Sequence, residues 1–211
     1  MITIETLLLF TGASILLALA PGPDIIFVIT QGIIKGKKAA IATTLGLSSG
    51  VLVHTTAAAF GISIIFKTSA LAFTLVKFLG AAYLFYLAFL SFKHRNAPIM
   101  INEEGKIKSE SFKKLYAKGF IMNVLNPKVA IFFLAFLPQF VNATNGSIPA
   151  QMIQLGIIFM MVTVCVFSLS GILANKASET LMKKPNFAKV INTISSLVFV
   201  SLGLKLAFSE R

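Results

Sequence analysis

The hydrophobic positions of this chain fall into long runs rather than into the short periodic patterns of a water-soluble domain. Two blocks contain no charged residue at all: Ala39–Phe66, of 28 residues, and Val129–Asn175, of 47 residues. Apolar runs longer than about 18 residues predict helices that cross a membrane. The chain is therefore expected to be an integral membrane protein.

The apolar runs predict six membrane spans, each of which would satisfy its backbone hydrogen bonds internally. The predicted spans are Thr6–Gly32, Ala39–Phe66, Ser69–Phe92, Gly119–Val141, Ile148–Ala174 and Phe187–Phe208. The longest connection, 93–118, has mixed charge and too few apolar residues for a core, so it is predicted to be a cytoplasmic linker, with a regulatory element as the alternative. It separates a first half, about 1–92, from a second half, about 119–211, of one all-α domain.

Composition agrees with this pattern, since 56% of the residues are hydrophobic and only 12% are charged. The net charge of +12 could by itself indicate nucleic-acid binding, but the lysines lie in short segments between apolar runs, which argues against that class. Fourteen of the Lys and Arg residues lie in or beside the first, third and fifth connections. Short cytoplasmic loops collect Lys and Arg, so these connections are predicted inside the cell and both termini outside. The opposite side has only Lys67, Lys77, Lys205 and Arg211.

The stretch LALA at residues 17–20 has a second interpretation, because its small residues resemble a signal-peptide cleavage site. Glu5 and the absence of Lys or Arg from the first residues favour a membrane span instead, as does the apolar pattern that resumes after the prolines. Cys165 is the only cysteine and lies inside a predicted span, so no disulfide framework and no cysteine-based metal site are expected. No cofactor is predicted.

Prolines interrupt two of the predicted spans at equivalent places. Pro21, Gly22 and Pro23 interrupt the first span, and Asn126 and Pro127 interrupt the fourth, so that PGPD aligns with LNPK at an offset of 104 residues. Each motif lies in the first span of a three-span half. Because three is odd, the halves would have opposite orientations and form an inverted repeat. Broken helices at matching places in inverted halves are the best sequence-level indication of a transporter's binding site.

Both breaks are predicted to lie near the middle of the membrane. Asp24 is 11 residues from Lys35, and Pro127 is 9 residues from Lys118. At ~1.5 Å per helical residue these separations put both breaks about 13–17 Å from the cytoplasmic edge of a ~30 Å hydrocarbon core. The two breaks are therefore expected to meet.

Each proline is expected to have two effects. It leaves the carbonyl four residues earlier without its helical donor, which affects Leu19 in the first half and Asn123 in the second. It is also favoured as the first residue of a new helix, here with Gly22 or Asn126 as the cap. Two half-helix N-termini would then direct free N–H groups into the centre of the protein, where such groups bind anions.

Asp24 and Lys128 occupy matching positions directly after the two breaks. A carboxylate is favourable near a helix N-terminus, whereas Lys128 opposes the helix dipole and requires a partner or a task inside a membrane. One interpretation is a structural ion pair between the two. The other is that they face a zwitterionic substrate, with Asp24 toward its ammonium and Lys128 toward its carboxylate. Asp24 is the only acidic residue deep in the membrane, which makes it the natural proton carrier.

The second predicted span carries small residues at four-residue spacing. Gly46 and Gly50 form a GxxxG pattern, which lets helix backbones approach closely. His54 shares this face, so it is expected to point at protein or at a cavity. Both a packed, hydrogen-bonded histidine and a proton relay fit that position.

Four segments together resemble the LysE/RhtB family of bacterial amino-acid exporters: PGPD, GLSSGVLVH, GAAYLFYLAF and GFIMNVLNPKVAIFFLAFLPQF. The resemblance covers nearly the whole chain and is weakest in the last two predicted spans, where Ile194–Ser196 stands at the place of an expected glycine. It implies a multi-pass protein of the bacterial inner (cytoplasmic) membrane that exports an amino acid or a small derivative. It also implies coupling to protons and frequent homo-oligomers.

Two other function classes are alternatives to export. Related branches of the superfamily move metal ions, so a permease for a metal or another small cation or metabolite stays the alternative. An enzyme is not expected, because the predicted spans contain neither paired aspartates nor an HExxH motif. The substrate's side chain is not fixed by these patterns.

Overall fold

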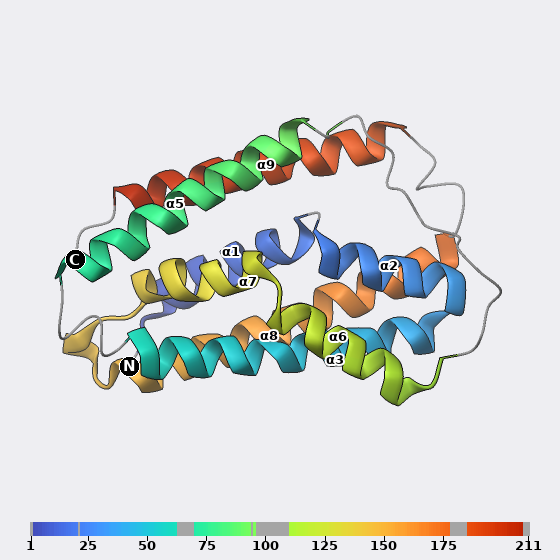
Figure 1. Ribbon diagram of the computed structural model, residues 1–211, viewed down its shortest axis with the longest axis horizontal. Helices are drawn as coiled ribbons and strands as arrows, with labels where there is room; N and C mark the ends of the chain where they lie inside the picture. Colours follow the sequence, from blue (N-terminus) through green and yellow to red (C-terminus); the bar gives the residue numbers. More distant parts are fainter. Residues whose placement is uncertain are drawn as a thin grey trace.

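The long apolar runs of the chain form helices that lie along one axis of the molecule (Figure 1). The computed structural model describes residues 2–20, 22–62, 70–93, 95, 110–177 and 185–208, and in these ranges it contains no strand. The α-helices are α1 (Ile4–Leu19), α2 (Pro23–Lys35), α3 (Lys37–Ala57), α5 (Ala70–Lys93), α6 (Phe112–Val124), α7 (Pro127–Ile131), α8 (Ile148–Ala177) and α9 (Pro185–Ala207). The short segments are π-helices η1 (Ala58–Ile62) and η2 (Phe132–Phe136) and 3-10 helices η3 (Leu137–Phe140) and η4 (Ala143–Asn145).

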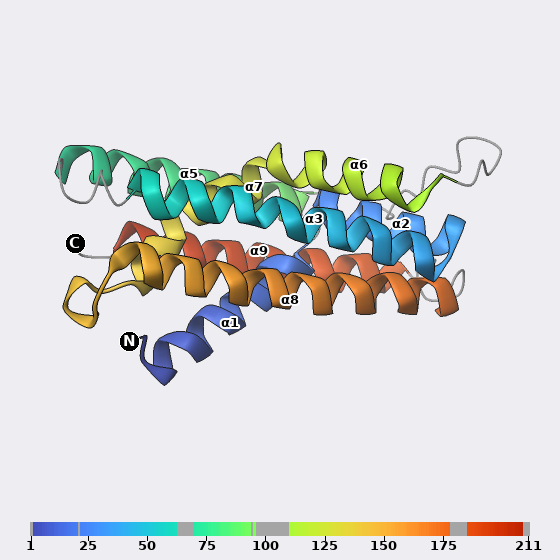
Figure 2. The same cartoon turned by 90° about the horizontal axis from the view of Figure 1, so that it is seen from below.

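The helices pack in two groups. α5 and α9 lie against each other along one side of the molecule (Figure 1), while α3 packs along α6 and α8 (Figure 2). The start of α1 and the end of α9 lie at one end of the molecule (Figure 1). The turn between α2 and α3 lies at the opposite end, which we call the basic end because Lys35, Lys37 and Lys38 flank this turn.

Length and composition qualify one described helix as a membrane span by itself. The stretch Ile148–Asn175 of α8 has 28 residues and a mean hydropathy of 2.5. The described residues give up to three spans when two bent pairs are each counted as one: α1 with α2, bent by 60°, and α6 with Pro127–Phe140, bent by 49°. The other predicted spans, and the arrangement of six spans as two repeats, stay predictions.

Local capping explains where two of these helices begin and end. The Ser111 hydroxyl accepts the Lys114 N–H at 3.4 Å, so α6 begins at Phe112, before the predicted start of the fourth span at Gly119. Leu115, 2% exposed, then packs in an apolar cluster with two alanines of α3, which supports the extra helical turns. The turn between α2 and α3 is a single residue, Gly36, whose φ of 84° favours glycine.

Phenylalanines fill the interior between the breaks and the end of the molecule opposite to the basic end. Neighbouring rings in this group have centroids 5.0–6.1 Å apart, in tilted and edge-to-face arrangements. We call this group the aromatic core; it consists of Phe10, Phe132, Phe133, Phe136, Phe140 and Phe159. Each of its side chains is at most 8% exposed, so this half of the interior is tightly packed and apolar.

Glycines mark the places where helices approach most closely. A Cβ on Gly46 would overlap the carbonyl oxygen of Tyr116 on α6, and one on Gly50 would lie 2.7 Å from the Asn123 side chain. On the other face of the bundle, a Cβ on Gly32 of α2 would overlap the Gly171 carbonyl of α8. These contacts fix α3 on α6 and the C-terminal end of α2 on α8.

We expect Gly46→Ala to lower the free energy of unfolding by about 1–3 kcal/mol, because the added methyl group overlaps the Tyr116 carbonyl oxygen. Gly12→Ala is the matched control, since a Cβ there meets nothing within 4 Å and alanine favours helix. The melting temperature of the detergent-solubilised variants measures the difference. An unchanged melting temperature for Gly46→Ala would contradict the close α3–α6 contact.

Candidate functional site

The first break leaves the carboxyl end of α1 without its usual hydrogen-bond donors. α1 ends at Leu19, α2 begins at Pro23, and Gly22 between them is extended. Prolines at 21 and 23 have no N–H, so the carbonyls of Leu17 and Leu19 have no helical donor four residues later. Pro21 itself lies outside the described residues.

Lys128, from the other half of the chain, supplies a donor to the first of these carbonyls, that of Leu17. Its Nζ donates to the carbonyl oxygens of Leu17 at 3.2 Å and Ala20 at 3.1 Å, and the residue is only 7% exposed. A Cβ on Gly22 would lie 3.0 Å from this nitrogen, so a glycine leaves room for the ammonium group. The lysine is unfavourable at the start of its own helix, α7, but favourable at the carbonyl end of α1.

The second break is closed by a side chain from α3. α6 ends at Val124 and α7 begins at Pro127, with the Asn126 Oδ1 accepting the Lys128 N–H at 2.9 Å as an N-cap. The Asn123 carbonyl, which loses its donor to Pro127, lies 2.9 Å from His54 Nε2 and 2.9 Å from the Asn126 N–H. His54 Nε2 must carry a proton to donate here, so the contact selects that tautomer.

Asp24 lies in the first turn of α2 and is 2% exposed. Its Oδ2 accepts a hydrogen bond from Asn123 Nδ2 at 2.9 Å. Its Oδ1 is buried and has no hydrogen-bond partner among the described residues, and the same holds for Asn126 Nδ2. Leaving such an atom unpaired inside a protein costs free energy. Asp24 Oδ1 is therefore able to receive a proton or a cationic group, and Asn126 Nδ2 is able to donate to an oxygen.

The two charged residues contact opposite breaks rather than each other. Asp24 of α2 bonds the end of α6 through Asn123, and Lys128 of α7 bonds the end of α1. Within the described part of the chain no ion pair joins Asp24 and Lys128. In this structure the ammonium group of Lys128 is bonded instead to the carbonyls of Leu17 and Ala20 at the end of α1.

His54 and Gly50 position the second break. The His54 ring is 8% exposed, with its centroid 6.0 Å from that of Phe133, so it connects the break to the aromatic core. This is the environment of a packed, hydrogen-bonded histidine. Gly50 leaves room for Asn123, whose amide then reaches Asp24.

Sequence reasoning missed a set of buried polar side chains between the breaks and the basic end. Each has an oxygen without a partner among the described residues: Gln31, Thr43, Thr44 and Ser48. Gln31 is seven residues after Asp24, a spacing that returns to the same helix face and could have identified it. The threonines and the serine gave no comparable signal, because such hydroxyls commonly bond their own helix.

The described residues contain no group of three or more His, Cys, Asp or Glu side chains that could hold a metal ion. In this part of the chain the buried polar atoms near the breaks are instead one carboxylate, two asparagine amides, one imidazole and one ammonium group. Such a set suits an organic molecule that carries both hydrogen-bond donors and hydrogen-bond acceptors.

A family model described as LysE type translocator matches residues 15–210. The uncharacterized membrane protein YrhP of Bacillus subtilis is 30% identical over 211 residues, which cover 97% of this chain and 100% of that protein. The homoserine/homoserine lactone efflux protein of Salmonella typhimurium is 29% identical over 209 residues, 99% of each chain. An uncharacterized membrane protein of Vibrio cholerae is 29% identical over 208 residues, 98% of each chain. No solved structure matches the chain.

We expect Lys128→Met to lower the melting temperature of the purified protein in the absence of any substrate. The substitution leaves the carbonyls of Leu17 and Ala20 without a donor, which costs about 1–3 kcal/mol. Lys113→Met, at an exposed position of α6, is the control and should leave the melting temperature unchanged. Equal melting temperatures for Lys128→Met and the unaltered protein would show that Lys128 does not hold the first break together.

Proposed function

The chain belongs to the LysE family of translocators, and from this premise we propose that it exports an amino acid or a small derivative in exchange for protons. Its relatives are named as membrane and efflux proteins, which makes it a membrane transporter rather than an enzyme. In the proposed arrangement it lies in the bacterial cytoplasmic membrane with both termini outside. The basic end then faces the cytoplasm, as the distribution of Lys and Arg favours.

The observation that carries the proposal is the unpaired Oδ1 of Asp24. A substrate ammonium group can donate to this atom while Asn123 keeps its bond to Oδ2, and hydrogen bonds to a charged group are strong. The unpaired Nδ2 of Asn126 is a donor for a carbonyl or carboxylate oxygen. An α-amino acid carries both groups, and so do its esters and the lactone of a hydroxy amino acid such as homoserine.

This assignment changes the expected role of Lys128. In the described state its ammonium group is bonded to two carbonyls of α1, so Asn126 rather than Lys128 is the better partner for the carboxyl end of the substrate. Lys128 holds the first break in shape and supplies positive charge nearby. The proposed site therefore does not require a free carboxylate on the substrate.

Asp24 also provides the proposed coupling to protons. Protonation removes the negative charge that binds an ammonium group, so a proton and the substrate compete for the same oxygen. Exchange of one for the other between the two sides of the membrane is antiport. One charge that crosses 100 mV supplies about 2.3 kcal/mol, or roughly a fifty-fold concentration gradient.

The proposal includes two inverted halves that meet at the breaks. The reciprocal contacts support it. Asp24, which follows Pro23, bonds the end of α6, and Lys128, which follows Pro127, bonds the end of α1. Positions 24 and 128 correspond at the offset of 104 residues, and so do positions 19 and 123. When Asp24 and Lys128 release these bonds and form them again, the side of the membrane from which Asp24 can be reached would alternate.

We expect Asp24→Asn to reduce export to background, at least about tenfold, because an amide cannot exchange a proton yet still accepts the bond from Asn123. Export is measured from cells loaded with a panel of amino acids that includes homoserine and its lactone. Glu5→Gln, the same change at an exposed position in α1, is the control and should export normally. Export by Asp24→Asn at the unaltered rate would eliminate Asp24 as the proton carrier.

A further inference from the structure

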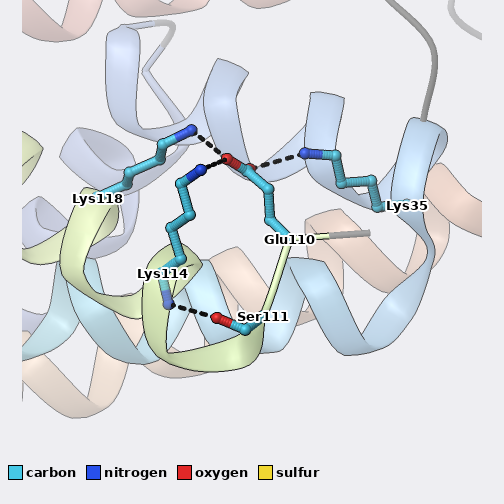
Figure 3. Close-up of polar contacts among 5 residues, drawn as sticks. All are labelled: Lys35, Glu110, Ser111, Lys114 and Lys118. Atoms are coloured by element: carbon cyan, nitrogen blue, oxygen red, sulfur yellow. Dashed lines mark hydrogen bonds and ion pairs between the residues drawn. The ribbon is translucent and has the colours of Figure 1, made fainter. Parts of the chain in front are cut away.

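A second cluster of charges lies at the basic end of the bundle, centred on the carboxylate of Glu110 (Figure 3). Its Oε2 lies 2.8 Å from Lys35 Nζ, and its Oε1 lies 2.5 Å from Lys118 Nζ and 3.3 Å from Lys114 Nζ. Lys35 is the last residue of α2, whereas Lys114 and Lys118 belong to α6. One carboxylate thus ties the end of α2 to the first turns of α6.

The centre of this cluster is shielded from water. The side chains of Glu110 and Lys35 are 13% and 19% exposed, whereas those of Lys118 and Lys114 are 48% and 63% exposed. Isolated exposed ion pairs contribute little, but several cations on one shielded carboxylate form a network. The Lys35–Glu110–Lys118 link is therefore the stronger part of the cluster.

The hydrogen bonds from Lys118 and Lys35 lower the pKa of Glu110 from its ordinary 4.5 to about 2. Because this folded-state pKa is depressed, the stabilisation is complete above pH 4.5 and is lost only as the pH falls toward 2. The groups that face this carboxylate are the side-chain nitrogens of Lys35, Lys114 and Lys118. The cluster therefore stays formed at physiological pH and is not itself operated by protons.

The two helices that Glu110 joins are those that carry the proposed substrate groups. α2 carries Asp24, α6 carries Asn123, and the two side chains meet at the break. Apart from this bond, α2 packs mainly on α3 and α8 and touches α6 only lightly. α2 is thus held on α6 at two levels, at the breaks and at the basic end.

The face of α2 between these two levels is polar. Asp24, Gln31 and Lys35 follow one another at spacings of seven and four residues, which bring them to one side of the helix. Gln31 is 7% exposed, and its buried Oε1 has no partner among the described residues. On the far side of the breaks the aromatic core closes the interior instead.

We propose that Glu110 is a latch that closes the path from the basic end of the molecule to Asp24. With Glu110 in place, Lys35 is held against α6 and the polar face of α2 is shut off from water. When the bonds to Lys35 break, the Lys35 side chain and Glu110 separate and uncover the path along Gln31, while the backbone of α2 stays packed on α8. The latch rests on the proposed function in one respect, that the path leads to the transport site.

A cysteine in the path tests this directly, because Cys165 is the only native cysteine. Gln31→Cys is introduced in a Cys165→Ser background, and the protein is placed in lipid nanodiscs, where reagents reach both faces. The rate of labelling by membrane-impermeant thiol reagents is then measured with and without Glu110→Gln. We expect the Glu110→Gln variant to label about fivefold faster or more. Both a cationic and an anionic reagent are used, so that altered local charge cannot account for the change.

Two lysines supply matched variants. Lys35→Gln removes the connection to α2 and should accelerate labelling as Glu110→Gln does, which also covers the case that Glu110→Gln fails to fold. Lys114→Gln removes only a pair within the α6 region and should leave labelling slow. Unchanged labelling in Glu110→Gln and Lys35→Gln, or equal acceleration in Lys114→Gln, would overturn the latch.

Labelling needs no substrate, so its outcome is separate from that of the export assay. Slow labelling in every variant, with normal export, would overturn the latch and leave the export proposal intact. Fast labelling in Glu110→Gln would support the latch as an access control. If the unaltered protein at the same time exported no amino acid, the proposed function would be contradicted.

Discussion

A backbone carbonyl in an apolar interior needs a donor, and this requirement governs the centre of the molecule. The prolines at positions 21, 23 and 127 remove amide hydrogens from two helices. The ammonium group of Lys128 and the imidazole of His54 replace some of what the prolines remove. A buried backbone group that water does not reach needs a partner from the protein, and side chains of other helices provide it at both breaks. His54 thereby connects α3 to the end of α6, and Lys128 connects α7 to the end of α1.

The same requirement explains why charge is tolerated in this interior. Lys128 faces the carbonyl end of α1, and Asp24 stands at the amide end of α2, so each charge meets a helix end of opposite sign. Each of the two also contacts the half of the chain to which it does not belong. Charge is thus concentrated where helix ends neutralise it. Among the described residues at the breaks, Asp24 Oδ1, Asn123 Oδ1 and Asn126 Nδ2 remain without a hydrogen-bond partner.

Much of this centre could be predicted from the sequence, because a proline acts locally. The identity of the freed carbonyl at Asn123, the cap at Asn126 and the close contact at Gly46 follow from spacing alone. The donor that each carbonyl receives could not be predicted, since it comes from a distant helix whose rotation depends on packing. That is why Lys128 was expected beside Asp24 and lies on Leu17 and Ala20 instead. Glu110 was missed because a charged loop residue has no periodic pattern to mark its partners.

Only one residue, Gly36, joins α2 to α3, so α2 can tilt as a rigid rod about this turn. The helix is a rod of 13 residues, about 20 Å long. Its carboxyl end is held on α8, where Gly32 packs on Gly171 and its carbonyl accepts a bond from Asn175 at 3.0 Å. A rod held at one end is a lever: a tilt of about 10° at Gly36 displaces the far tip by roughly 3–4 Å. That displacement is comparable to the 2.9 Å length of the hydrogen bond between Asn123 and Asp24, so a small rotation of α2 suffices to separate them.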